Sequence, residues 1–211
     1  MSALGLRPIV APLLTIQPMP SDLPQDAAAV LITSGNAVDG LPAWARGRPI
    51  FAVGDATAAS ARAAGFAEVY SAGGNAADLA ALVQRALPAQ YGQLLLLTGK
   101  GQGSALASLL RAQKRDVIVR EVYEAVAVPR LPAPAAEVLE GDDLRAALLF
   151  SAETARQFVQ LVTTAGLEAS LQNADACAIS PAAGMALEAL RWRRIRIAAR
   201  PTQDDMLALL R

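Results

Sequence analysis

The stretch Leu31-Ile-Thr-Ser-Gly-Asn-Ala-Val38 and the later stretch Leu148-Leu-Phe-Ser-Ala-Glu-Thr-Ala155 follow one plan. Each has an apolar run of strand length, then a turn of small and hydroxyl residues, then a segment suited to a helix. A second pair repeats the plan, with Phe51-Ala-Val-Gly-Asp-Ala-Thr-Ala58 in the first half of the chain and Ala178-Ile-Ser-Pro-Ala-Ala-Gly-Met-Ala186 in the second. This repeat predicts two similar α/β lobes, and therefore a cleft between them.

The same alternation of apolar runs with Ala- and Leu-rich segments continues along the chain. It is typical of parallel sheets that are covered by helices on both faces, so we expect each lobe to be a parallel sheet flanked by helices. The expected strands are 8–10, 29–33, 50–53, 68–70, 93–98, 117–122, 147–151, 176–180 and 195–198, and the expected helices are 56–64, 76–86, 104–113, 153–165 and 182–190.

Two proline-rich stretches, 12–24 and 129–134, interrupt this series next to the β-like runs 13–17 and 121–128. We expect proline to exclude helix in both stretches, and it suits a semi-rigid crossing between lobes. We therefore expect an inserted lobe at 18–122 and a discontinuous lobe made of 1–17 and 132–211. The crossings between them are expected at 12–24 and 122–134.

Composition excludes several classes of function. Lys+Arg and Asp+Glu number 19 each, so no overall field attracts nucleic acid or an anionic membrane. The chain has no histidine, which removes the usual general base and the commonest metal ligand. The single cysteine, Cys177, lies in an apolar run and reads as an inert core residue. No leader and no apolar run of about 20 residues is evident, so we expect a cytoplasmic protein with no membrane partner.

The turns after the expected strands are rich in small and hydroxyl residues. In an open parallel sheet, ligands bind beyond the carboxyl ends of the strands, where helix N-termini present free N–H groups. Taken singly, each such residue is more often the N-cap of its helix, but five such turns together could hold several carboxylates or phosphates. The turns are Thr33-Ser34-Gly35-Asn36, Gly54-Asp55-Ala56-Thr57, Thr98-Gly99-Lys100-Gly101, Ser151-Ala152 and Ser180-Pro181.

The glycine-rich turn at 98–104 has neither the residue order of a P-loop nor that of the dinucleotide fingerprint, which argues against binding of ATP or NAD. Tyr123 lies where the chain leaves the inserted lobe. It either points into the cleft or packs its ring against the crossing strands. The acidic residues Glu121, Glu124, Asp55 and Glu153 read as solvated surface charges.

The order of these motifs resembles that of the uroporphyrinogen-III synthase family of tetrapyrrole biosynthesis. The resemblance covers nearly the whole chain. It rests on Ile32-Thr-Ser-Gly-Asn-Ala-Val, Ala52-Val-Gly-Asp-Ala-Thr-Ala, Thr98-Gly-Lys-Gly to Leu110, Val122-Tyr-Glu, Phe150-Ser, Ala178-Ile-Ser-Pro and Ala199-Arg-Pro-Thr-Gln-Asp-Asp-Met-Leu.

The resemblance implies two lobes joined by a two-stranded connection, an active site in the cleft, and no metal or organic cofactor. Its substrate would be hydroxymethylbilane, a linear tetrapyrrole with eight carboxylates, which is cyclised to uroporphyrinogen III with inversion of ring D and loss of water. We expect a monomer with no nucleic-acid partner.

The resemblance also assigns roles to residues. The family's motif tyrosine matches Tyr123, which would donate a hydrogen bond to the departing hydroxyl. The pyrrole nitrogen drives that departure, ring D attacks the resulting azafulvene, and a spiro intermediate rearranges. The residues expected to bind the substrate are Thr33, Ser34, Gly35, Asn36, Thr57, Gly99, Lys100, Gly101, Ser151, Ala152, Ser180 and Ala183.

Two departures from the family pattern bear on these expectations. Members of the family usually begin with a strand and a longer first helix, whereas Met1-Ser-Ala-Leu-Gly-Leu-Arg-Pro8 resembles only the end of that helix, so we expect a shortened first βα unit. Ala182 and Ala183 stand where a threonine often follows Ile-x-Pro, which leaves only backbone N–H groups there. Two other readings therefore stay open: a two-lobed module that binds an anionic ligand without chemistry, and an inactive synthase-like protein.

Overall fold

The computed structural model describes residues 5–88 and 90–211, which divide into two compact units. One unit is Ile16–Ala125, and the other joins the segment that ends at Thr15 to Val126–Arg211. The chain passes between the units within strand β1 (Leu14–Pro18) and again within strand β6 (Val117–Ala127). The lobe limits expected at residues 17 and 122 fall inside these same two strands.

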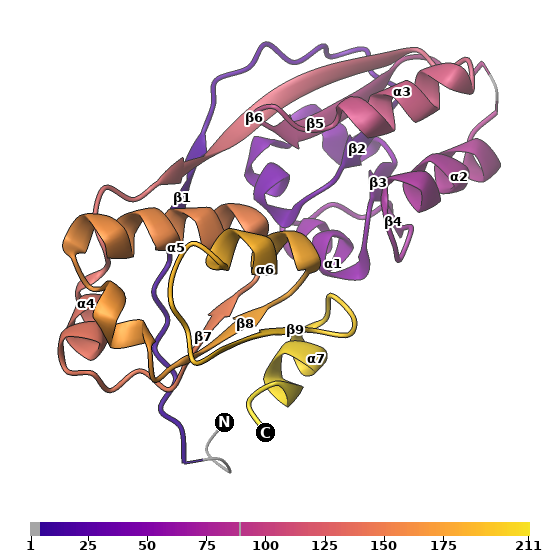
Figure 1. Ribbon diagram of the computed structural model, residues 1–211. Helices are drawn as coiled ribbons and strands as arrows, with labels where there is room; N and C mark the ends of the chain where they lie inside the picture. Colours follow the sequence, from indigo (N-terminus) through magenta and orange to yellow (C-terminus); the bar gives the residue numbers. More distant parts are fainter. Residues whose placement is uncertain (1–4, 89) are drawn as a thin grey trace. The chain divides into compact units, whose positions relative to one another are not determined.

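The unit Ile16–Ala125 is built on a six-stranded sheet with the order β1-β6-β5-β2-β3-β4 (Figure 1). Strands β2 to β6 are parallel, whereas β1 lies at the edge and runs against β6, as the bonds Met19 N to Val122 O and Val128 N to Leu13 O indicate. The other strands are β2 (Ala29–Ile32), β3 (Ile50–Ala52), β4 (Val69–Ser71) and β5 (Leu94–Gly99).

The central strands of this sheet are apolar on both faces, and helices cover both faces and keep these side chains from water. In β5, Leu95 and Leu97 belong to the core on one face, while Leu94 and Leu96 belong to the core on the other, and all four are fully buried. Each such side chain contributes about 1.5–3 kcal/mol relative to exposure. The first core includes helix α1 (Asp55–Ala63) and the 3-10 helices η2 (Gly35–Gly40) and η3 (Ala43–Gly47), and the second includes α2 (Ala76–Ala86) and α3 (Ser104–Ala112).

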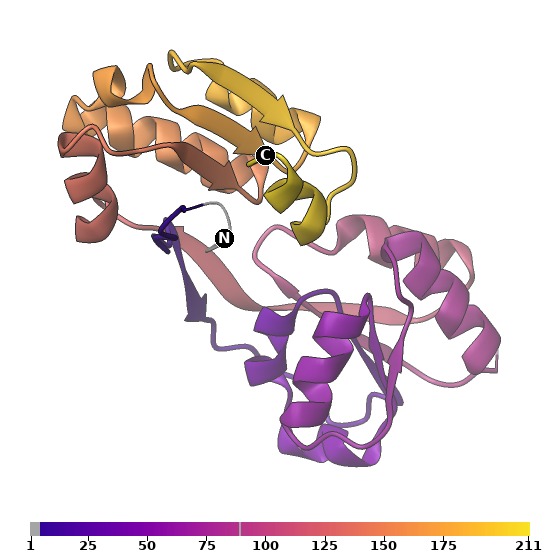
Figure 2. The same ribbon diagram turned by 90° about the horizontal axis from the view of Figure 1, so that it is seen from below.

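The discontinuous unit has a parallel three-stranded sheet in the order β7-β8-β9. Side chains of α5 and α6 pack in the core of one face, whereas Met206 of α7 packs with Cys177 in a smaller core, so the helices lie on both faces (Figure 2). The elements are α4 (Ala133–Glu140), β7 (Ala146–Leu149), α5 (Ala152–Ala165), η4 (Glu168–Leu171), β8 (Asp175–Ala178), α6 (Pro181–Leu187), β9 (Arg194–Ile197) and α7 (Gln203–Ala208).

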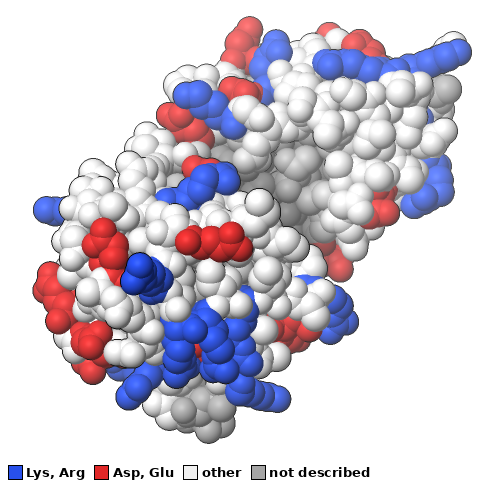
Figure 3. Space-filling model, in the orientation of Figure 1, with Lys and Arg blue, Asp and Glu red and all other residues white. Residues whose placement is uncertain are grey.

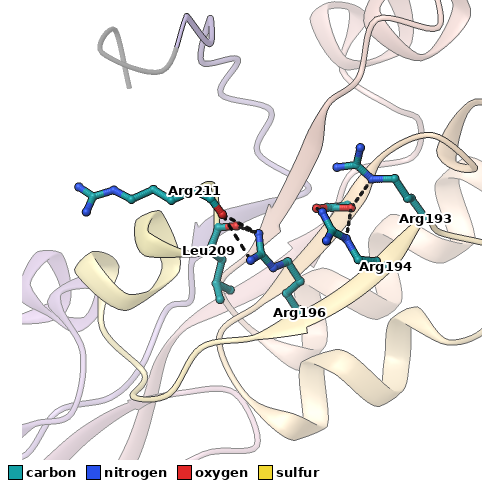
Figure 4. A network of polar contacts seen from close by, with 6 residues as sticks. Arg193, Arg194, Arg196, Leu209 and Arg211 are labelled. Atoms are coloured by element: carbon teal, nitrogen blue, oxygen red, sulfur yellow. Dashed lines mark hydrogen bonds and ion pairs between the residues drawn. The ribbon is translucent and has the colours of Figure 1, made fainter.

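A buried carboxylate fastens β9 to β8 in this unit. The side chain of Asp175 is 7% exposed and accepts hydrogen bonds from Arg193 Nε at 2.7 Å and Arg194 Nη2 at 3.0 Å (Figure 4). The bond from Arg193, with help from Arg194, outweighs the opposing effect of burial and lowers the pKa of Asp175 from 3.8 to about 2. Both arginines are exposed, and Figure 3 shows a group of basic side chains on the surface of this unit.

Two expectations about secondary structure were wrong. Residues 8–10 form no strand, since Val10 is 83% exposed and the first strand begins at Leu14. The stretch 129–134 was expected to exclude helix, yet α4 begins within it. Pro132 is the N-cap and Pro134 lies in the first turn, where the missing N–H of proline has no intrahelical partner to lose.

No helix in the described part of the chain is long and apolar enough to cross a membrane. The Cys177 thiol is fully buried, and this burial raises its pKa, as suits an inert core residue.

Candidate active site

The strand order places a topological switch point between β2 and β5. From β2 the chain builds outward through β3 and β4, then returns to the opposite side of β2 with β5 and continues to β6. Ligands of open α/β sheets bind outside the carboxyl ends of the strands at such a point, because the connections diverge to opposite faces there. The turns after β2 and β5 flank it, the turn after β3 is next along the edge, and Tyr123 lies in β6 beside β5.

The turn after β2 contains Thr33, Ser34, Gly35 and Asn36. Ser34 is the N-cap of η2, and its Oγ accepts a hydrogen bond from Asn36 N at 3.2 Å. The capping interpretation is therefore correct for the oxygen of Ser34. Its hydroxyl hydrogen can still be donated to a ligand, because a serine hydroxyl is both donor and acceptor.

Helix α1 starts after β3 with an uncapped N-terminus. Its N-cap is Gly54, which offers no side chain, whereas α2 is capped by Asn75 and Asp78 in a reciprocal capping box. The N–H groups of the first turn of α1 have no partner in the described chain, and the helix dipole makes this end attractive to an anion. Of the two helix starts, only that of α1 is open to a carboxylate.

Thr57 lies in this first turn and adds a second donor. It is only 8% exposed, yet its hydroxyl makes no hydrogen bond within the described residues. Gln113 Oε1 is the one fully buried side-chain oxygen or nitrogen that lacks a partner in the described part of the chain. The Thr57 oxygen must therefore reach the surface, where it can bind a ligand.

The turn after β5 brings Gly99, Lys100 and Gly101 against β6. Lys100 N donates to Tyr123 O at 2.8 Å and Gln102 N donates to Gly99 O at 3.0 Å, which closes the turn. Gly101 has a φ of +71°, in the left-handed region that favours glycine. The turn is thus fixed by its own backbone.

Two acidic side chains of β6 bind this turn, so the expectation that Glu121 and Glu124 are solvated charges was wrong. Gly101 N donates to Glu121 Oε1 at 2.7 Å, and Lys100 Nζ lies 2.9 Å from Glu124 Oε2. The hydrogen bond and charge of Glu124 raise the pKa of Lys100. Sequence reasoning missed these contacts because they depend on β6 lying next to β5, which only the strand order decides.

Tyr123 combines a buried ring with a free hydroxyl. The residue is 4% exposed and packs in the core on the α1 face. A Cβ added to Gly99 would lie 2.8 Å from Tyr123 Cε2 and Cζ and 3.0 Å from its hydroxyl oxygen, so the ring rests directly on Gly99. The hydroxyl makes no hydrogen bond within the described residues, and by the same reasoning as for Thr57 it reaches the surface.

The discontinuous unit carries its own donors at the carboxyl edge of β7 and β8. Ser151 caps α5 by accepting from Thr154 N at 3.0 Å, and Ser180 caps α6 by accepting from Ala183 N at 3.3 Å. Ala183 is fully buried and its N–H is already used, whereas Ala152 occupies the first position of α5. Each unit therefore presents neighbouring donors along one edge of its own sheet.

A family model for uroporphyrinogen-III synthase HemD matches residues 1–208. The chain belongs to the uroporphyrinogen-III synthase family. It is an enzyme that cyclises hydroxymethylbilane in haem biosynthesis.

The fold is shared with a solved structure. Uroporphyrinogen-III synthetase from Helicobacter pylori 26695 has a TM-score of 0.68 at 20% identity, over 93% of this chain and 89% of that chain. A mutant uroporphyrinogen III synthase from the extremely thermophilic bacterium Thermus thermophilus has a TM-score of 0.48 at 16% identity, over 98% of this chain and 89% of that chain. No match is found among curated protein sequences.

Proposed function

We propose that the Tyr123 hydroxyl donates a hydrogen bond to the hydroxyl group that leaves hydroxymethylbilane. The observation that supports this role most is the combination of a ring held by packing on Gly99 and a hydroxyl with no partner in the described chain. A phenol donates without prior ionisation, so no histidine is required.

We also propose that the donors of both units contact carboxylates of the substrate. In the unit Ile16–Ala125 the open N-terminus of α1 supports this most directly, because it offers free N–H groups beside the unbonded hydroxyl of Thr57. The proposed binding residues are Thr33, Ser34, Gly35, Asn36, Thr57, Gly99, Lys100 and Gly101 in this unit, and Ser151, Ala152 and Ser180 in the discontinuous unit. Ala183, which was also expected to bind, is left out because it is fully buried and its N–H is bound to Ser180 Oγ.

The substrate supplies most of the reactivity. Its pyrrole nitrogen expels the terminal hydroxyl, which leaves as water, and the substituted carbon of ring D then attacks the azafulvene. The protein has to hold the tetrapyrrole so that this carbon lies near the reacting end, and orientation of this kind is worth roughly 7–11 kcal/mol in favourable cases. Fixed carboxylate contacts at several turns are suited to that task.

The exchange of Tyr123 to Phe tests the role of the hydroxyl. We expect turnover to fall by roughly 100- to 1,000-fold, the range for loss of one positioned donor. The melting temperature should stay unchanged, because the exchange removes one oxygen that has no partner in the described chain. Tyr70→Phe is the matched control, since Tyr70 is 46% exposed and stacks on Phe51 at 5.2 Å. Equal turnover for Tyr123→Phe and Tyr70→Phe would show that the Tyr123 hydroxyl has no catalytic role and that the residue serves only in packing.

We propose further that the chain acts as a cytoplasmic monomer without a nucleic-acid partner. The balance of 19 basic and 19 acidic residues supports the last of these points, because no overall positive field attracts nucleic acid. Light scattering coupled to gel filtration measures the mass directly, and a mass of twice 21.9 kDa would oppose the monomer.

A further inference from the structure

Two donor groups of the turn after β5 already bind carboxylates of the protein. The N–H of Gly101 is bound to the carboxylate of Glu121 at 2.7 Å, and the ammonium of Lys100 is bound to the carboxylate of Glu124 at 2.9 Å. Both acids come from β6, the strand that pairs with β5, so they are held beside the turn by the sheet itself. Two donors at the switch point are thus already bound to carboxylates, the same chemical group that the substrate carries.

Contacts of this type oppose the binding of an external carboxylate. A hydrogen bond to an ionised acceptor is stronger than a neutral one, and a tethered carboxylate competes at a high effective concentration. Neither acid is fully buried, and the side chain of Glu124 is 31% exposed, so each can swing into solvent when it is displaced. An incoming carboxylate has to displace Glu121 to bind the N–H of Gly101. At Lys100 it competes with Glu124 for the ammonium, which has three N–H donors.

We propose that Glu121 and Glu124 are internal competitors that set the affinity of the enzyme for the carboxylates of its substrate and product. With no ligand they satisfy the donors of the turn, and they withdraw when a ligand carboxylate takes their place. Their return on the donors assists release of the product, which has the same carboxylates as the substrate. The inference rests on the proposed binding role of the Gly99–Gly101 turn.

Binding of uroporphyrin, an unreactive macrocycle with eight carboxylates, measures this competition without turnover. Glu121→Gln replaces the carboxylate by a weaker, neutral acceptor, and we expect the dissociation constant for uroporphyrin to fall by roughly 3- to 10-fold, the size of one charge-assisted hydrogen bond reduced by partial exposure. Glu124→Gln is expected to act in the same direction through Lys100. Glu68→Gln is the control, since it removes one exposed charge from the far edge of the same sheet.

Glu121→Asp separates competition from simple charge repulsion. Aspartate keeps the negative charge but is one methylene shorter, so it no longer reaches Gly101 N. Competition predicts tighter uroporphyrin binding in both Glu121→Asp and Glu121→Gln, whereas general repulsion predicts wild-type affinity for the aspartate variant.

Weaker binding in both variants would overturn the proposal and assign Glu121 the task of shaping the turn. Wild-type affinity in Glu121→Asp would also overturn it. The outcome is independent of the proposed catalytic function. If the Glu121 variants bind uroporphyrin more tightly but the wild-type chain forms no uroporphyrinogen III, the competitor role stands and the catalytic function is refuted. If the variants bind uroporphyrin with unchanged affinity and the wild-type chain is active, the competitor role is refuted and the catalytic function stands.

Discussion

Exchange of Gly99 to Ala is expected to damage both the packing and the position of Tyr123. The added Cβ would lie 2.8 Å from two ring carbons, whereas ordinary contacts begin at 3.4 Å, so the ring has to move by at least about 0.6 Å (3.4 − 2.8). Overpacking of this size costs about 1–3 kcal/mol of stability. A catalytic group misplaced by ~1 Å can lose ~100-fold in rate, so we expect a fall of roughly 10- to 100-fold in turnover.

Thermal unfolding and the rate of uroporphyrinogen III formation give the two readouts. Gly47→Ala is the matched control, because a Cβ at Gly47 meets nothing within 4 Å. In a Tyr123→Ala background the clash disappears, and Gly99→Ala should then cost less than about 0.5 kcal/mol. An equal loss of stability in both backgrounds, or wild-type stability and rate for Gly99→Ala alone, would refute the contact between Gly99 and Tyr123.

Two further outcomes follow from the unbonded threonine and the buried aspartate. Thr57→Val should raise KM for hydroxymethylbilane by roughly 10-fold, as for one hydrogen bond to a charged group, and leave the melting temperature unchanged; an unchanged KM would remove Thr57 from the binding residues. Asp175 has a native pKa of about 2 against 3.8, so its stabilising effect is complete above about pH 4 and is lost as the pH falls through 2. Because the arginine partners of Asp175 are half exposed, we expect the ion pairs to contribute about 1–2 kcal/mol to the free energy of unfolding. Between pH 4 and pH 2, urea unfolding should therefore show a loss of stability that is smaller by this amount in Asp175→Asn than in the wild type. An equal loss in both proteins would exclude the ion pairs as a source of stability.

The strands were predictable from the sequence because parallel strands with two covered faces are apolar throughout. Leu94 to Leu97 and Ala29 to Ile32 are continuous apolar runs without polar alternation, so both their position and their buried parallel class can be read from the sequence. Helix α4 was missed for a local reason, since proline excludes a helix interior but suits its first turn. The strand expected at 8–10 is absent because this short apolar segment has no neighbouring strand with which to form backbone hydrogen bonds.

The candidate site was predictable only as a set of turns. The motif order located the residues of each turn, and the N-cap alternative was also correct for Ser34, Ser151 and Ser180. Which donors stay open could not be read from the sequence, because it depends on contacts across strands. Glu121 and Glu124 reach the Gly99–Gly101 turn through such contacts, and the sequence offers no periodic signal for them.

The isomer that the purified chain makes from hydroxymethylbilane tests the central claim most directly. Spontaneous closure leaves ring D uninverted and gives the type I isomer, whereas an enzyme that directs attack to the substituted carbon gives type III. Chromatographic separation of the oxidised products should show predominantly uroporphyrin III from the wild-type chain, with a larger share of type I from Tyr123→Phe. Type I alone, at high enzyme concentration, would contradict the account.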